Sequence, residues 1–149
     1  MLTSSQIESQ LSKYKAWYWQ HYPLCIFCGH RVKSGDLAHL IRKSYSIPLQ
    51  TVKLNTGLAH RQCHSIFDDD PGQAIYLPRI TEVMYIIWTI DVNYFNQISH
   101  NFKELNDIFA RFPEVPKQKL DHHGEMLQLT YLYGGTINHK EVQNNKQYP

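Results

Sequence analysis

Hydrophobic residues near the start of the chain recur at helical spacing. A repeat of this period predicts an amphipathic helix, here over residues 4–21. Ser5 followed three positions later by Glu8 has the form of a capping box at its start, and Pro23 ends it. The apolar stripe consists of Ile7, Leu11, Tyr14 and Trp17/Tyr18.

The next segment has shorter apolar runs. Residues 36–41 are apolar except at Asp36 and His39, which predicts a strand, and a second strand is expected near 51–54. A helix is expected to start at His60 and continue to Phe67. The helical period would place His64 and Asp68 on the same face.

Beyond Pro78 the hydrophobic residues again follow helical spacing, from Ile80 to Phe109, with a break at Asp91. This pattern predicts one long helix or two. Residues 83–88 are apolar nearly all round, so the helix is either deeply buried or packed on a partner. A strand over 83–90 is the alternative, because the run is short and rich in β-branched residues.

These elements predict one α+β domain over residues 1–149. Its parts are an N-terminal helix segment (4–22), a core (23–72), a helical extension (73–133) with a last helix over 117–133, and a loose polar tail (134–149). The chain is 42% hydrophobic and 13% aromatic, enough for one substantial core. No membrane span or signal peptide is expected, and we predict a cytoplasmic protein.

Charge is unevenly distributed along the chain. Residues 1–67 carry eight Lys/Arg against two acidic residues, a net +6, whereas residues 68–149 carry seven against eleven, a net −4. The basic half also holds the metal-ligand residues. This asymmetry suits a partner with a phosphate backbone, although six charges can also simply solvate a surface.

Cysteine spacing points to a metal site rather than to disulfides. The chain has three Cys, of which Cys25 and Cys28 form a Cys-x-x-Cys pair. His60 and Cys63, again two residues apart, are the natural second pair for a structural Zn²⁺. His64 is the alternative fourth ligand. Ordinary buried thiols are the other interpretation.

A second set of polar residues accompanies the zinc pattern: His39, Asn55, His64 and Asp68. An imidazole beside a bound divalent ion can act as a general base on water. His64 and Asp68, one helical turn apart, can hold such an ion. Asn55 can orient backbone or imidazole through its amide.

The order Cys-x-x-Cys, Asp-x-Ala-His, Asn and His-x-x-Cys-His-x-x-x-Asp over residues 25–68 resembles the HNH endonuclease family. These are ββα-metal nucleases, and the form here is most similar to phage-type members. The resemblance implies a small ββα-metal core on a zinc knuckle, with helices flanking it on both sides.

The resemblance implies catalytic roles for His39, as general base, and Asn55. It implies that His64 and Asp68 bind a catalytic Mg²⁺ or Mn²⁺. Many family members carry a metal-binding residue directly before the general base, where this chain has Ala38. The resemblance puts Asp36 forward as the substitute. Residues 36 and 39 point to opposite faces of a regular strand, so Asp36 can bind the ion only if the strand is bulged or bent; the alternative is that it orients the loop.

These expectations describe a metal-dependent DNA endonuclease, with Arg42, Lys43 and Arg61 as contacts to the nucleic acid. No helix rich in Arg, Asn and Gln stands out for base readout, so we expect structure-selective or weakly sequence-specific cleavage. One alternative is a catalytically silent zinc module that binds nucleic acid or protein. Another is an assembly protein that forms a homodimer through the aromatic stretch 80–109.

Overall fold

The structure is a computed structural model and describes residues 2–112. The helix predicted over 117–133 and the tail predicted over 134–149 lie outside the described residues. The described part is α+β, mostly helical, with a small two-stranded sheet. The helices are α1 (Ser4–His21), α2 (Arg61–Asp69), α3 (Pro71–Ala74), α4 (Ile80–Ile90), α5 (Val92–Ile98) and α6 (Asn106–Phe109). The strands are β1 (Asp36–His39) and β2 (Thr56–Ala59), and three 3₁₀ segments are η1 (Pro48–Thr51), η2 (Lys53–Asn55) and η3 (Ser99–Leu105).

Helix α1 confirms the first predicted element but begins with a different cap. Thr3, not Ser5, is the N-cap, and its hydroxyl accepts a hydrogen bond from the Gln6 N–H at 3.2 Å. The Gln6 side chain accepts one in return from the Thr3 N–H at 2.8 Å. Thr3 and Gln6 therefore form the capping box that the sequence pattern assigned two positions later.

The sheet is a regular antiparallel pair in which Asp36 lies opposite Ala59 and His39 opposite Thr56. Strand β1 starts where predicted and ends at His39, two residues early. The second strand was predicted in the wrong place, since residues 51–54 run through 3₁₀ turns and β2 begins at Thr56. The buried Tyr18 of α1 fixes this segment, because its hydroxyl donates to the carbonyl oxygens of Thr56 at 2.9 Å and Lys53 at 3.1 Å.

The aromatic stretch forms separate helices, and residues 83–90 are helical rather than a strand. Asp91 ends α4 and caps α5, its carboxylate accepting from the Tyr94 N–H at 3.0 Å. A second break follows at Phe102, which has non-helical backbone angles. Much of α4 is at most 1% exposed, namely Val83, Met84, Ile86 and Ile87. This apolar surface is therefore buried in the chain's own core. It does not need a partner to cover it, so it no longer argues for a homodimer.

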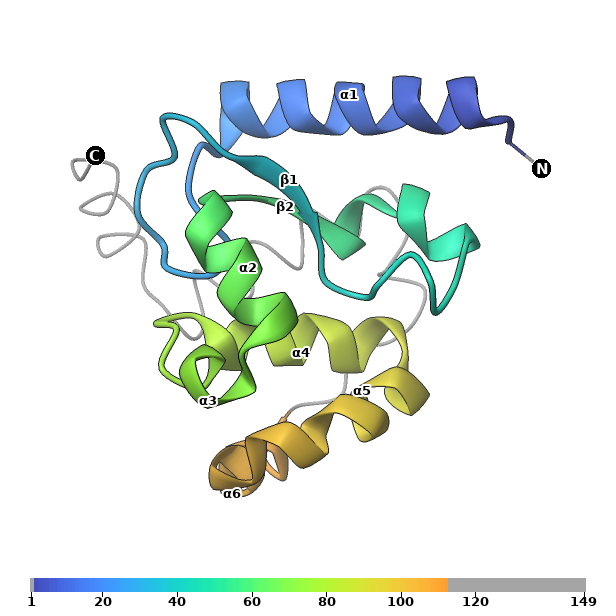
Figure 1. Ribbon diagram of the computed structural model, residues 1–149. Coiled ribbons are helices and arrows are strands. Elements are labelled where there is room, and N and C mark those ends of the chain that lie inside the picture. The colour runs from blue at the N-terminus through green and yellow to red at the C-terminus, as the bar shows by residue number, and fades with distance from the viewer. Residues whose placement is uncertain (1, 113–149) are drawn as a thin grey trace.

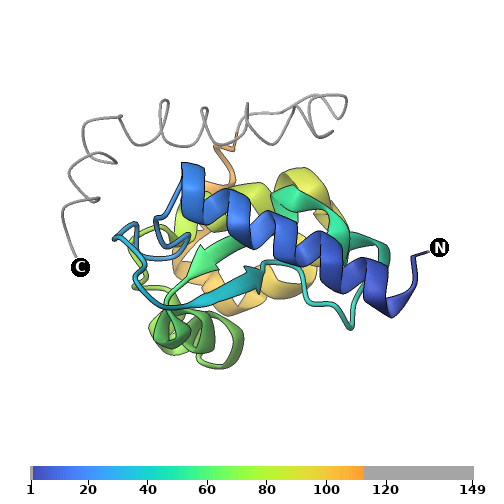
Figure 2. The same cartoon turned by 90° about the horizontal axis from the view of Figure 1, so that it is seen from above.

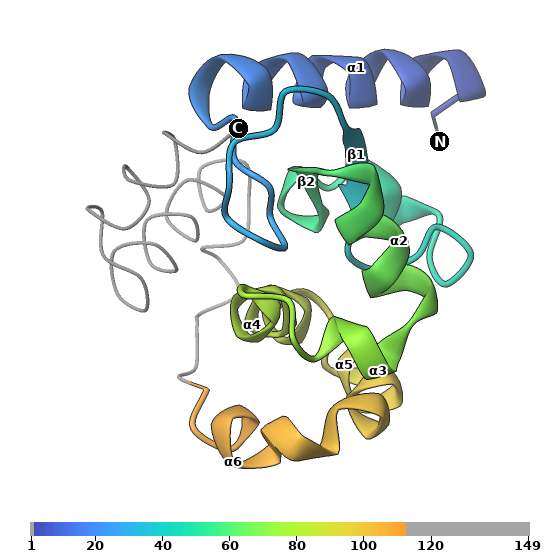
Figure 3. The same cartoon turned by 60° about the vertical axis from the view of Figure 1, so that its left-hand side comes forward.

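The sheet lies between two helical layers (Figure 1). Helix α1 runs along one side, and α4, α5 and α6 lie on the other. Helix α2 runs beside the strands and faces outward, which Figure 3 shows from a second direction. From above, α1 crosses over the two strands (Figure 2). Within residues 2–112, no helix combines the length and apolar character needed to cross a membrane.

Candidate metal centre and adjoining polar site

The first pair of cysteines sits on a tight turn between Leu24 and Arg31, which form an isolated antiparallel bridge. The Gly29 N–H donates to the Cys25 carbonyl at 2.8 Å, and Gly29 has a φ of 81°. A side chain is disfavoured at this backbone angle. A Cβ on Gly29 would also collide with the buried guanidinium of Arg79. Glycine is thus required for the turn that brings the two thiols to one side.

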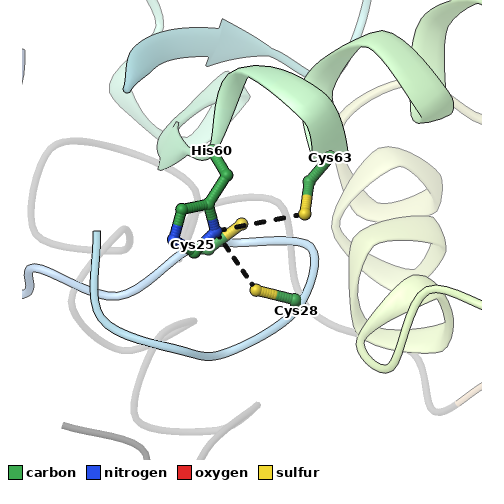
Figure 4. A group of neighbouring side chains, drawn as sticks. All are labelled: Cys25, Cys28, His60 and Cys63. Carbon is green, nitrogen blue, oxygen red and sulfur yellow. Dashed lines mark hydrogen bonds between the residues drawn. The ribbon is translucent and has the colours of Figure 1, made fainter. Parts of the chain in front are cut away.

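Helix α2 supplies the other half of the centre. His60 is its N-cap residue and Cys63 lies in its first turn, so both point toward the Cys-x-x-Cys turn (Figure 4). The ligand atoms of Cys25, Cys28, His60 and Cys63 all lie within 4.8 Å of one another. The Nδ1 atom of His60 is 3.3 Å from the Cys28 sulfur and 4.0 Å from the Cys63 sulfur. Ligands around tetrahedral zinc are separated by about 3.5–3.8 Å, so this Cys₃His group can hold a metal ion such as zinc.

The imidazole of His60 is oriented for that role by a main-chain group. Its Nε2 atom lies 3.1 Å from the carbonyl oxygen of Arg31. A carbonyl can only accept, so Nε2 carries the proton and Nδ1 presents a lone pair toward the sulfurs. Between the two candidate fourth ligands, the geometry selects His60 over His64.

The three thiols influence one another strongly. Hydrogen bonds from the Cys28 and Cys63 thiols lower the pKa of Cys25. The pKa values of Cys28 and Cys63 are raised, chiefly because each donates to the Cys25 sulfur. Three sulfurs this close cannot all ionise without a compensating cation. The centre is thus suited to a divalent ion rather than to three independent thiols.

An aromatic pair ties the Cys-x-x-Cys turn to the far end of α2. Phe27, between the two cysteines, is fully buried, and its ring stacks on that of Phe67 with centroids 4.8 Å apart. The position of α2 is therefore fixed at its start by His60 and Cys63 and near its end by Phe67. His64 lies between these two points and Asp68 directly follows Phe67; both belong to the second predicted site.

His64 lies between two carboxylates. Its Nε2 atom is 3.1 Å from Asp68 Oδ2, one helical turn on, and its Nδ1 atom is 3.4 Å from Asp36 Oδ2. The carboxylate of Asp68 raises the pKa of His64 most, and Asp36 adds to the shift against the effect of burial. Asp36 also pairs with Arg61 at 3.2 Å, and this guanidinium lowers its pKa.

Strand β1 is regular and has no bulge, so the condition for Asp36 to bind the ion is not met. Asp36 nevertheless faces α2 and contacts His64. It approaches the ring edge opposite Asp68, so the two carboxylates do not converge on one nitrogen. Among residues 2–112, only the Cys₃His group brings three or more ligand atoms close together.

His39 ends β1 and points its ring at the loop that follows. Its Nε2 atom is 2.9 Å from the carbonyl oxygen of Gln50. Burial lowers the pKa of His39, and the positive charge of Lys43 and the neighbouring His64 lower it further. His39 is thus biased toward the neutral form, and it is close enough to His64 and Asp68 for their charges to act on it.

Asn55 is fully buried, and its side-chain amide hydrogen-bonds to main-chain groups. Its Oδ1 atom accepts from the Ile41 N–H at 2.7 Å, and Nδ2 donates to the carbonyl oxygens of Ile41 at 3.2 Å and Leu49 at 3.0 Å. These bonds close the long connection between β1 and β2. Asn55 therefore orients backbone, one of the two tasks considered for it, and holds the segment that contains Gln50.

The three predicted nucleic-acid contacts surround the polar site and are exposed. Arg42 donates to the main-chain carbonyl of Asp68, Lys43 acts electrostatically on His39, and Arg61 pairs with Asp36. Two further participants were missed, the carbonyl groups of Arg31 and Gln50. Every residue has a main-chain carbonyl, so no sequence signal could have indicated them.

Comparison with known proteins adds no assignment. No family model, no curated protein and no solved structure matches this chain. The functional interpretation therefore rests on the site itself.

Proposed function

We propose that this protein is a metal-dependent endonuclease that hydrolyses DNA phosphodiester bonds, with a ββα-metal core of the HNH type. The proposal rests on one observation above all. A histidine biased toward the neutral form, His39, lies close enough to an imidazole–carboxylate pair, His64 and Asp68, for their charges to act on it. The pair is on α2, whose start meets the Cys-x-x-Cys turn at the Cys₃His group.

His39 is the proposed general base. The Gln50 carbonyl accepts the Nε2 proton, so Nδ1 carries the lone pair that would take a proton from water. Burial keeps the ring from being protonated at neutral pH. Asn55 supports this arrangement by holding the loop that contains Gln50.

His64 and Asp68 are the proposed ligands of a Mg²⁺ or Mn²⁺ ion. Their Nε2 and Oδ2 atoms are 3.1 Å apart, close to the edge of about 3.0 Å between adjacent ligands in octahedral Mg²⁺ coordination. The carboxylate oxygen of Asp68 suits these ions chemically, whereas an imidazole nitrogen is the more usual ligand of Zn²⁺, Fe, Cu or Ni. When bound, the ion would supply charge stabilisation to the phosphoryl group and the leaving oxygen.

The Cys₃His group is the proposed structural zinc site. It joins the Cys-x-x-Cys turn to the start of α2, the helix that carries His64 and Asp68. The zinc would thereby hold these two residues beside β1 and His39. All four positions are occupied by protein ligands, which is the arrangement of structural rather than catalytic zinc.

DNA is the proposed substrate because exposed cations flank the polar site. Arg42, Lys43 and Arg61 lie around His39, His64 and Asp36, where they can meet phosphates on either side of the scissile bond. Phosphate contacts of this kind position a strand without reading its sequence. This supports structure-selective or weakly sequence-specific cleavage.

The test is nicking of supercoiled plasmid by the zinc-loaded protein with Mg²⁺, with Mn²⁺ and with no added divalent ion. We expect metal-dependent nicking that His39→Ala reduces at least a hundredfold. His100→Ala removes an exposed histidine far along the chain and should cut like the parent. Equal nicking by the parent and His39→Ala would reject the role of His39.

A second candidate is a catalytically silent zinc module, and Ala38 favours it. Ala38 is fully buried opposite Gly57, so the residue before His39 offers no metal ligand. The catalytic ion would then have only His64 and Asp68 from the protein. Absence of nicking with every metal, together with one bound zinc per chain and salt-dependent DNA binding, would favour this module.

A further inference from the structure

The two carboxylates beside His64 lie on different atoms of its ring, and this difference separates their functions. Asp68 lies by Nε2 at 3.1 Å and Asp36 by Nδ1 at 3.4 Å. The two nitrogens of an imidazole point away from each other, so one ion cannot bind both. A cation on Nε2 has Asp68 within ligand distance and Asp36 on the far edge of the ring.

An imidazole that binds a metal through one nitrogen carries its proton on the other. A carboxylate that accepts this proton fixes the tautomer, turns the ring and makes the ligating nitrogen more basic. Asp36 Oδ2 occupies the position of such an acceptor at Nδ1 of His64. Asp36 is also held in place, because β1 is in regular register and Oδ1 is engaged by Arg61 at 3.2 Å.

We propose that Asp36 is a positioning residue rather than a metal ligand: it accepts the Nδ1 proton of His64 and thereby presents Nε2, with Asp68, to the divalent ion. This inference rests on the proposed second-metal site. It explains how a chain with Ala38 before its general base can still hold an ion, because Asp36 orients His64 by a hydrogen bond at the ring nitrogen that does not bind the ion. Arg61 contributes by keeping Oδ1 of Asp36 occupied, which leaves Oδ2 for His64.

The test is Mn²⁺ affinity, measured by electron paramagnetic resonance of the free ion, on protein that carries one zinc per chain. Asp36→Ala removes the acceptor and the charge, whereas Asp36→Asn removes the charge and keeps an oxygen that can accept. We expect Asp36→Ala to bind Mn²⁺ about 10–100-fold more weakly, and Asp36→Asn to recover most of that loss. Asp69→Ala, which removes an exposed neighbouring charge, should stay within about threefold of the parent.

A second readout follows the proton itself. With saturating Mg²⁺, ¹H–¹⁵N correlation spectra of the imidazoles should show a proton on Nδ1 of His64 in the parent and in Asp36→Asn. The resonance should broaden or disappear in Asp36→Ala. A residue that acted only by adding negative charge would not produce this difference between Asn and Ala.

Different results reject different claims. Unchanged Mn²⁺ affinity in Asp36→Ala, while His64→Ala and Asp68→Ala both lose binding, would overturn the role of Asp36 and leave the second-metal site standing. Equal losses in Asp36→Asn and Asp36→Ala, with the Nδ1 proton unaffected, would make Asp36 a direct ligand and also overturn it. If neither His64→Ala nor Asp68→Ala weakens Mn²⁺ binding, the second-metal site itself is rejected and the inference with it.

Discussion

The Nε2 atom of His39 lies 2.9 Å from the carbonyl oxygen of Gln50, and this contact determines which ring nitrogen is available for chemistry. Because the carbonyl accepts the Nε2 proton, the free lone pair is on Nδ1. Gln50 belongs to the connection between β1 and β2, which Asn55 closes with three hydrogen bonds to main-chain groups. The orientation of His39, the proposed base, thus depends on the buried side-chain amide of Asn55, five residues after Gln50.

The pH dependence of nicking should report the lowered pKa of His39. A general base works when deprotonated, so the rate should rise with pH through the pKa of His39 and then level off. Burial and the Lys43 charge place this pKa below its ordinary value of about 6.5. We therefore expect the midpoint of the rise below 6.5, measured at saturating Mn²⁺ so that protonation of His64 does not limit metal binding.

Lys43→Ala provides the matched test of that shift. Removal of the positive charge should move the midpoint of the rate profile to higher pH, because the imidazolium of His39 is then repelled less. Lys33→Ala removes another exposed lysine and should leave the midpoint where it is. A midpoint at or above pH 6.5 in the parent, or one that Lys43→Ala does not move, would contradict the assignment of His39 as the general base.

Replacement of Asn55 should destabilise the fold as well as the site. Asn55→Ala would leave the N–H of Ile41 and the carbonyl oxygens of Ile41 and Leu49 without their partner, in a fully buried position. We expect the free energy of unfolding to fall by about 3 kcal/mol, as measured by urea denaturation of the zinc-loaded protein. Asn93→Ala, at an exposed position of α5, should change it by less than about 0.5 kcal/mol.

Asn55→Asp sharpens this prediction. The carboxylate keeps an acceptor for the Ile41 N–H but replaces the Nδ2 donor with an oxygen that faces two carbonyl groups. It should therefore destabilise the protein at least as much as Asn55→Ala. A milder effect of the aspartate would mean that the two donated bonds contribute little.

The parts predicted well from the sequence are those determined by neighbouring residues. The capping residues aside, α1 follows from helical spacing, and the positions of His64 and Asp68 on α2 follow from the period of one turn. The pairing of Cys25 and Cys28 with His60 and Cys63 follows from ligand spacing, and the structure brings these four residues together. The break at Asp91 was also visible as a polar residue in an apolar pattern.

The parts that could not be predicted depend on residues far apart in the chain or on main-chain groups. The segment in which β2 starts is tied to α1 by Tyr18, whose hydroxyl hydrogen-bonds to the carbonyl groups of Lys53 and Thr56. The protons of His39 and His60 are placed by the carbonyls of Gln50 and Arg31. The alternation of a strand separates Asp36 from His39, but it does not show that α2 lies across the first residue of β1, where Asp36 meets His64.

The turn that carries the first two cysteines should be sensitive to a single methyl group. Gly29→Ala places a Cβ at a φ of 81° and against the buried guanidinium of Arg79. We expect a loss of about 2 kcal/mol or more in the free energy of unfolding, together with weaker zinc binding. Gly72→Ala is the matched control, since its Cβ would meet only Asp70 Oδ1 at 3.6 Å within α3, and it should be neutral or slightly stabilising. Equal stability of the two variants would show that the turn is not strained by a side chain.

The last prediction concerns the fourth ligand of the Cys₃His group. His60→Ala should release zinc, because its Nδ1 atom lies 3.3 Å and 4.0 Å from two of the sulfurs, whereas His64 is engaged with Asp36 and Asp68. His64→Ala should keep one zinc per chain. Elemental analysis after dialysis gives the stoichiometry, and chelator competition should show at least a tenfold weaker affinity in His60→Ala. Removal of zinc from the parent with a strong chelator should also lower the unfolding temperature, since α2 then loses its anchor at Cys63. Zinc retained by His60→Ala but lost from His64→Ala would reverse the assignment, and His64 would no longer be free to serve a second ion.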